Sequence, residues 1–226
     1  MSKLLPRIDY YFDVISPYSW IGFEALHQLK NQWNDVDIKY IPCSLGTIMR
    51  ESGNKPPAMV PNRGIMLMKD VERSAKYWGM NMKQPPQFME WIFKYTTRDA
   101  LILLLVIQEE DGEELMIKTS REMWNRLWWK GEKIFEDEDF VQILKAVGVK
   151  DVEGKLKRMK DEKYKNRLKE NTNEAMDGRA YGAPWITVHT VDGNKHQFFG
   201  SDRFHFIAEL LDQPQPLPDR LLKHKL

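Results

Sequence analysis

Cysteine is nearly absent from this sequence. Among 226 residues there is one cysteine, Cys43. A single cysteine excludes an intramolecular disulfide framework, a cysteine-rich zinc site and a Cys-x-x-Cys redox pair. Because Cys43 directly follows an expected strand, we interpret it as a buried thiol rather than a nucleophile. The five histidines show no metal-ligand spacing, so no metal site is predicted.

The sequence also lacks an excess of charge of one sign and a long hydrophobic run. Lys and Arg number 34 against 33 Asp and Glu, which gives a formal net charge of +1. General binders of nucleic acid or anionic membranes usually carry a larger basic excess, so neither partner is expected. The longest apolar stretch, Ala100 to Ile107, is too short to span a bilayer. The N-terminus lacks the apolar core of a signal peptide, which predicts an intracellular protein without a cleaved leader.

What the sequence does contain is an ordered series of strand and helix patterns. Residues 8–15 are rich in β-branched and aromatic side chains, 20–33 follow a helical period, and 36–41 alternate apolar and polar residues. This order has the size of a βαβ unit. Helical patterns then predominate. The candidate helices are 65–78, 87–94, 98–110, 113–129, 137–147 and 152–176.

The end of the chain returns to strands. Residues 185–191 and 196–199 are expected strands joined by an Asp-Gly turn, and 204–211 an expected helix. A βαβ unit followed by ββα is the plan of the thioredoxin fold, so we predict an α/β fold of that kind with a large all-helical insertion. The predicted domains are 1–62 with 179–226, discontinuous in sequence, and 63–178 for the insertion. The tail from 212 is expected to be extended.

Ser16-Pro17-Tyr18-Ser19 falls at the turn from the first strand into the first helix. In thioredoxin-like proteins the Cys-x-x-Cys pair lies there, where free N–H groups and the helix dipole stabilise a thiolate. Serines at both positions exclude disulfide exchange but retain a pocket suited to the thiolate of a bound thiol. A hydrogen bond from the Ser16 hydroxyl to that sulfur would lower the thiol pKa, ordinarily about 8.5. Ser16 is equally a favoured residue for simply capping the helix.

Three other segments are candidate ligand contacts. A cis bond at Ala183-Pro184 would free the backbone of Ala183 for a ligand's peptide group, although a turn proline is the simpler interpretation. Ser201 and Asp202, at a helix start, either hold a carboxylate or only cap the helix.

The third segment is the loop 52–57, which contains Asn54 and lies close to Arg63. An amide and basic groups on a loop suit a carboxylated peptide, and the alternative is a solvated loop. The methionines from Met66 to Met89 either pack the core or line an apolar substrate groove.

Taken in order, these motifs resemble the kappa-class glutathione transferases over nearly the whole chain. The segments that carry the resemblance are 11–20, 52–57, 122–128, 166–172, 182–184 and 199–203. The resemblance implies a thioredoxin domain with a helical insertion, as in the disulfide oxidoreductase DsbA. It also implies a homodimer that uses glutathione as a co-substrate and has no permanently bound cofactor.

The resemblance further implies a role for each site residue. Ser16 would hydrogen-bond the glutathione sulfur, flanked by Pro17 and Tyr18. Asn54 would lie near the glycine end, with Arg63 where the family often has lysine. The backbone of Ala183, before a cis Pro184, would contact the cysteinyl part of glutathione. Ser201 and Asp202 would hold its γ-glutamyl group. Ala183, where the family often has a bulkier apolar residue, and Trp185 depart from the pattern, so the acceptor pocket is expected to differ.

We therefore expect a glutathione transferase that conjugates a small electrophile or reduces a hydroperoxide. Two alternatives stay open. One is a glutathione-dependent isomerase similar to the 2-hydroxychromene-2-carboxylate isomerases, and the other is a redox-dead module that binds partner proteins. The final His224-Lys225-Leu226 resembles a peroxisomal signal, with the mitochondrion or cytosol as alternatives.

Overall fold

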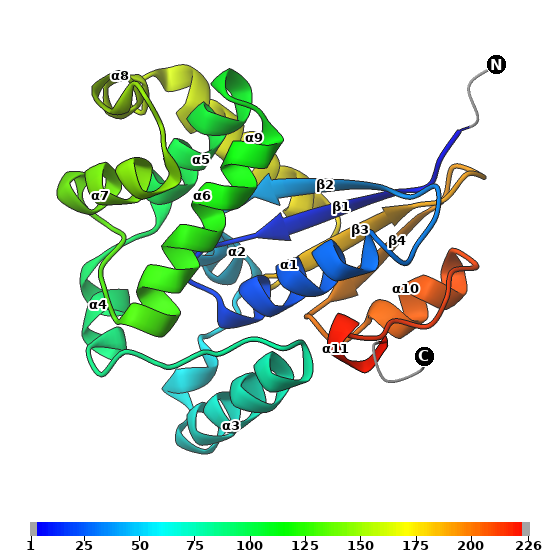
Figure 1. Ribbon diagram of the computed structural model, residues 1–226. Coiled ribbons are helices and arrows are strands. Elements are labelled where there is room, and N and C mark those ends of the chain that lie inside the picture. The colour runs from blue at the N-terminus through cyan, green and yellow to red at the C-terminus, as the bar shows by residue number, and fades with distance from the viewer. Residues whose placement is uncertain (1–3, 223–226) are drawn as a thin grey trace.

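The structure is built on one mixed four-stranded sheet. The computed structural model describes residues 4–222, and its strands lie in the order β2-β1-β3-β4 (Figure 1). The strands are β1 Arg7–Phe12, β2 Asp37–Pro42, β3 Trp185–His189 and β4 Lys195–Phe199. β1 runs parallel to β2 and antiparallel to β3, so that Tyr10 lies opposite both Tyr40 and Ile186. β3 and β4 are antiparallel, and these pairings confirm the expected thioredoxin-like plan.

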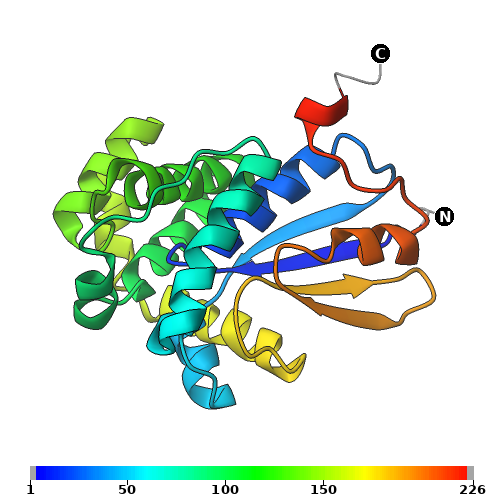
Figure 2. The ribbon, with the colours of Figure 1, turned by 90° about the horizontal axis from the view of Figure 1, so that it is seen from below.

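Helices cover both faces of the sheet. On one face, the even-numbered side chains of β1 are buried in the main core with α1 (Pro17–Leu29) and α10 (Phe204–Leu210). On the other face, Tyr11 and Trp185 form a smaller core with residues of α2 (Leu45–Ser52) and α9 (Glu162–Asp177). Successive strand side chains point to opposite faces, which explains why β1 feeds two cores. Figure 2 shows α1 and α9 on opposite sides of the strands.

The turn from β1 into α1 is tighter than the sequence pattern indicated. The expected strand to residue 15 ends at Phe12, and the expected helix from residue 20 already begins at Pro17. Ser16 is the N-cap, and its hydroxyl oxygen accepts a hydrogen bond from the Ser19 N–H. Proline fits the first helical position because its missing N–H would have no partner there. The Ser16-Pro17 pair, which the sequence placed at the turn into the helix, is therefore the start of the helix itself.

A group of helices occupies the chain between β2 and β3. These are α3 Pro61–Tyr77, α4 Phe88–Lys94, α5 Arg98–Glu110, α6 Glu113–Asn125, α7 Asp137–Val147 and α8 Val152–Arg158, followed by α9. A 3₁₀ turn, η1 Pro57–Met59, precedes α3, and a π-helical turn, η2 Arg126–Lys130, extends α6. Every residue from Ala100 to Ile107 on α5 is buried, so this apolar stretch is the centre of a core. No helix within residues 4–222 has the length and apolar character needed to cross a membrane. The division into two domains stays a prediction.

The helical segments differ from the predictions most clearly at two places. The expected helix 152–176 is divided into α8 and α9, because Arg158 and Asp161 close a turn between them. The change of direction lets Lys155 of α8 and Tyr164 of α9 both reach Glu110, at 2.6 and 3.4 Å. The second, α2, was not predicted at all. Its ends carry clear signals, a Ser44 N-cap and a left-handed Gly53 after the last turn.

The tail beyond residue 211 was expected to be extended, and this is only partly correct. A short helix, α11 Asp219–Leu222, ends the described chain. The segment before it is held to the turn after α1, since the Trp33 indole N–H donates to the Pro214 carbonyl and the Gln32 amide donates to the Leu217 carbonyl. The predicted targeting signal at His224, Lys225 and Leu226 lies outside the described residues and stays a prediction.

Candidate active site

A cavity of about 1720 Å³ opens where β1 turns into α1. It lies among the β1–α1 turn, α2, the start of α3, the loop before β3 and the loop before α10. All nine residues implied by the family resemblance line it. They are Ser16, Pro17, Tyr18, Asn54, Arg63, Ala183, Pro184, Ser201 and Asp202. The structure thus brings together residues that are up to 186 positions apart in sequence.

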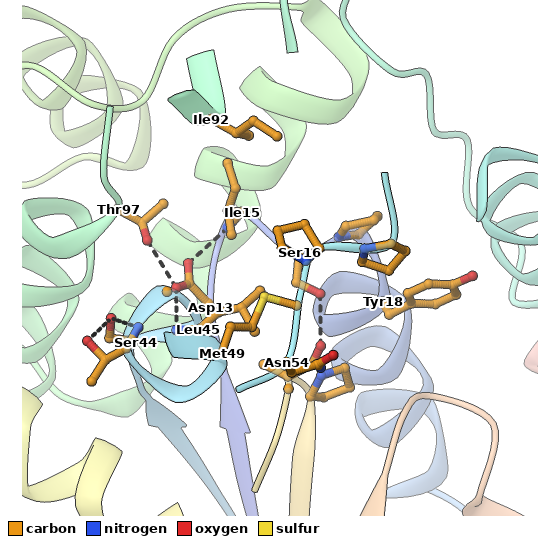
Figure 3. Close-up of a pocket in the computed structure, with 18 of the residues that line it drawn as sticks. Asp13, Ile15, Ser16, Tyr18, Ser44, Leu45, Met49, Asn54, Ile92 and Thr97 are labelled. Atoms are coloured by element: carbon orange, nitrogen blue, oxygen red, sulfur yellow. Dashed lines mark hydrogen bonds between the residues drawn. The ribbon is translucent and has the colours of Figure 1, made fainter. Parts of the chain in front are cut away.

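Ser16 occupies the centre of this arrangement. Its side chain is only slightly exposed, and its hydroxyl oxygen caps α1 by accepting from the Ser19 N–H at 3.1 Å. Its hydroxyl also donates to the Ala183 carbonyl at 3.1 Å (Figure 3). Ser16 therefore caps α1 and also lines the cavity with its hydroxyl, although the sequence presented these two roles as alternatives. Without a ligand, the single hydroxyl proton of Ser16 is donated to the Ala183 carbonyl oxygen.

The loop before β3 closes one side of the cavity. The peptide bond between Ala183 and Pro184 is cis, as the family resemblance implied. The Pro184 carbonyl accepts from the Gly200 N–H at 3.1 Å, which joins this loop to the segment before α10. That segment presents buried Ser201 and exposed Asp202, whose carboxylate pairs with Arg203 at 3.1 Å. The alternative that these two residues only cap the helix is wrong, because the N-cap of α10 is Arg203 and has no side-chain capping bond.

Tyr18 connects α1 to α3 rather than reaching Ser16. Its hydroxyl donates to the Asp70 carboxylate of α3 at 2.9 Å. Burial, and then the hydrogen bond to Asp70, raise the pKa of Tyr18 well above its ordinary value. Tyr18 therefore stays protonated near neutral pH and fixes α3 beside the cavity.

Asn54 holds the loop between α2 and α3. Its amide nitrogen donates to the Tyr181 carbonyl at 2.6 Å, and its amide oxygen accepts from the Lys55 N–H at 2.8 Å. Figure 3 shows Asn54 on the same side of the cavity as Ser16. Arg63, in the first turn of α3, makes no ion pair with any residue in the described range 4–222. It is a cation at the cavity wall to which a carboxylate can bind.

The carboxyl group of Asp13 is a feature that sequence reasoning missed. It is fully buried in the wall of the cavity and accepts three hydrogen bonds, from Ile15 N–H at 3.0 Å, Leu45 N–H at 2.9 Å and the Thr97 hydroxyl at 3.0 Å (Figure 3). Burial raises its pKa from 3.8 to about 6, although all three hydrogen bonds act to lower it. Its own carbonyl accepts from the Ser16 N–H at 3.1 Å. Asp13 therefore ties the Ser16 turn to the starts of α2 and α5.

The remaining sequence hypotheses divide between packing and the cavity. Met66, Met68 and Met89 line the cavity, whereas Met80 and Met82 pack against the main core. Cys43 is fully buried, and burial, followed by the nearby Asp13, raises its pKa well above its ordinary value. The thiol is thus a packed group rather than a nucleophile.

Comparison with known proteins places the chain in a family. The model of the DsbA-like thioredoxin domain matches residues 7–212. Glutathione S-transferase kappa 1 of Caenorhabditis elegans is 62% identical over 98% of this chain and 97% of its own length. The chain belongs to the kappa class of glutathione S-transferases. The human kappa 1 protein is 35% identical over 92% of both chains.

The solved structures agree with the kappa-class assignment at the level of the fold. A 2-hydroxychromene-2-carboxylate isomerase superposes on this kappa-class chain with a TM-score of 0.74 and 18% identity, and 97% of each chain is covered. At this identity the likeness shows the fold alone. The DsbA-like thioredoxin fold with its helical insertion is thereby confirmed.

Proposed function

We propose that this kappa-class chain binds glutathione in the cavity at Ser16, activates its thiol and transfers it to an electrophile. The observation that carries this proposal is the position of Ser16. Its hydroxyl lines the cavity at the N-terminus of α1 and faces the backbone of Ala183. An anion is stabilised at such a helix end by free N–H groups and the helix dipole.

Binding requires the Ser16 proton to change partners. Its hydroxyl has one proton, which points to the Ala183 carbonyl in the free protein. When the sulfur arrives, the hydroxyl turns to donate to it, and the Ala183 carbonyl becomes available to the ligand's backbone N–H. The oxygen of Ser16 keeps accepting from the Ser19 N–H, which polarises the hydroxyl toward the sulfur. One ligand thus replaces an internal hydrogen bond with two intermolecular ones.

The other lining residues suit the two charged ends of glutathione. Arg63 and the amide of Asn54 line the cavity and suit the glycine carboxylate. The backbone near Ser201 and the carboxylate of Asp202 also line it and suit the γ-glutamyl carboxylate and ammonium. Binding both ends holds the sulfur near Ser16, so that a second substrate bound in the same cavity meets it in a fixed position.

The chemical step needs no covalent intermediate with the protein. The glutathione thiolate attacks the electrophilic carbon, a C–S bond forms, and the leaving group departs with the electrons of the broken bond. Toward a hydroperoxide, the same thiolate attacks the terminal oxygen and breaks the O–O bond. The alkoxide takes up a proton, and a second glutathione converts the sulfenic acid into glutathione disulfide and water.

A homodimer and a peroxisomal location remain part of this proposal.

The test is a pH titration of the absorbance of bound glutathione thiolate, in the wild-type protein and in Ser16→Ala. A hydrogen bond to a charged group contributes about 1.5–3 kcal/mol, so Ser16→Ala should raise the thiol pKa by about 1–2 units. Ser19→Ala is the matched control, because the Ser19 hydroxyl is buried in the same turn and has no hydrogen-bond partner among residues 4–222.

The outcomes separate the hypotheses. An unchanged thiol pKa in Ser16→Ala would refute the role of Ser16. A wild-type protein that does not bind glutathione would refute both the transferase and the isomerase, and would leave a partner-binding module. Since Ser16→Ala also removes a helix cap worth about 1 kcal/mol, a thermal melt of each variant establishes that it is folded.

A further inference from the structure

The cavity is larger than one tripeptide requires. Pockets for drug-sized ligands measure about 300–1,000 Å³, whereas this cavity encloses about 1720 Å³. The residues assigned to glutathione line only part of it. The rest has two parts of different chemistry, an apolar wall beside Ser16 and a group of cations from α9 and α5, called here the basic end.

The apolar wall begins at the residue next to Ser16. It is formed by residues of the β1–α1 turn, α2, α4 and η2, namely Ile15, Met49, Phe88, Met89, Ile92 and Trp128. Figure 3 shows Ile92 facing Ile15 above Ser16. The rings of Phe88 and Trp128 pack at a centroid distance of 4.6 Å, which makes this part of the wall continuous. An apolar group placed along it lies next to the reacting sulfur.

The basic end is formed by one face of α9 and the first residue of α5. Lys165 and Lys169 are four residues apart, so they lie on the same face of the helix. Arg98 joins them from α5, and all three line the cavity. Glu162 is the one carboxylate of this group, and it pairs with Lys165 at 2.5 Å. Within residues 4–222 neither Arg98 nor Lys169 makes an ion pair, so the basic end carries unneutralised positive charge.

Hydrogen bonds connect this end rigidly to the Ser16 turn. Thr97, which precedes Arg98, donates to the Asp13 carboxylate at 3.0 Å. Thr172, three residues after Lys169, accepts from the Ser44 N–H at 3.0 Å. Asp13 and Ser44 in turn hold the β1–α1 turn and the start of α2. The backbone segments that carry the cations are thus held in a fixed place relative to the Ser16 turn.

We propose that the second substrate of this transferase is an amphipathic carboxylate, whose apolar body lies along the wall and whose carboxylate binds Lys169 and Arg98. The inference rests on the proposed function only in placing the reacting group at the glutathione sulfur. Burial of an apolar body of several methylenes contributes more to binding than charge pairs that stay partly exposed to solvent. The wall therefore provides most of the affinity, and the cations select the charged form over the neutral one.

The experiment uses octanoate and octanamide as probes, titrated calorimetrically into the protein with and without saturating glutathione. The two probes have the same length and differ in charge. We expect octanoate to bind the wild-type protein about fivefold to tenfold more tightly than octanamide, the ratio that two partly screened charge contacts give. In Lys169→Gln this preference should fall to about threefold, and in Arg98→Gln combined with Lys169→Gln it should disappear.

The matched control is Lys163→Gln. Lys163 lies on α9 outside the cavity lining and pairs with Glu109, so its removal changes the net charge equally but should leave the preference unchanged. Equal binding of the two probes, no binding of octanoate, or displacement of octanoate by glutathione would each overturn the inference. The thiolate titration of the wild-type protein decides the proposed function independently, because it involves neither probe.

Discussion

The buried carboxyl group of Asp13 makes the stability of the protein depend on pH in a predictable direction. It has no exposed surface, and no ion pair within residues 4–222 includes it. Its charge is balanced only by hydrogen bonds from Ile15, Leu45 and Thr97. Ionisation of this group therefore opposes folding.

The sign and magnitude follow from proton linkage. The folded-state pKa of about 6 lies above the ordinary 3.8 of the unfolded chain, so the folded protein binds this proton more tightly. The stabilisation is complete below about pH 4 and is lost as the pH rises through 6. At 1.36 kcal/mol per pKa unit, the whole effect is about 3 kcal/mol, of which about 2 kcal/mol falls between pH 4.5 and 7.

Asp13→Asn removes the titration with little change of shape. Its amide can accept hydrogen bonds through one oxygen only, so one of the three donors loses its partner at a cost of about 1–3 kcal/mol. That cost does not vary with pH. The free energy of unfolding of the wild-type protein, minus that of Asp13→Asn, should therefore decrease by about 2 kcal/mol between pH 4.5 and 7.

Urea unfolding followed by tryptophan fluorescence measures this difference, since the chain contains eight tryptophans. Taking the difference between two variants cancels the titration of all other groups. Asp177→Asn, at an exposed position, is the matched control for the loss of a carboxylate that is not buried. A difference for Asp13→Asn that is constant, or one that grows with pH, would refute the argument from burial.

Two further predictions concern the interior. Cys43 should resist alkylation by iodoacetamide in the folded protein and react fully in urea, because its thiol is buried with a raised pKa; rapid labelling of the folded protein would contradict its placement. Leu104→Ala on α5 should lower the free energy of unfolding by about 2–5 kcal/mol in urea titrations, because the residue is fully buried in the main core. A loss below about 1 kcal/mol would contradict this, because it would mean that neighbouring side chains refill the space left by the leucine.

The strands and the longest apolar helix were predictable because their patterns are complete within a few residues. β1, β3 and α5 each have an uninterrupted buried stretch, and their type was correct. The bounds of α5 matched the prediction, whereas β1 and β3 end earlier than expected. α2 was missed because its eight residues have only one buried side chain, Ile48. Its stability comes from its two caps and its contact with α9, and the contact is not visible in a local pattern.

The candidate site was predictable only through its motifs. Each was ambiguous alone, and their order along the chain indicated that the thioredoxin plan would bring them together. The cavity contains all nine residues, while their individual roles stay predictions. Asp13 could not be found this way, because an acidic residue after a strand usually begins a turn. Its burial depends on α2 and α5, which approach from later parts of the chain.

The strand order has a consequence for synthesis on the ribosome. β1 lies inside the sheet between β2 and β3, yet β3 begins roughly 140 residues after β2 ends. At a synthesis rate of about 5–20 residues per second, one edge of β1 stays unpaired for roughly 7–30 s. During that time the unpaired edge can pair with a strand of another chain. The nascent chain therefore depends on early packing of α1 and the helices that follow, or on a chaperone, until the last quarter of the protein emerges.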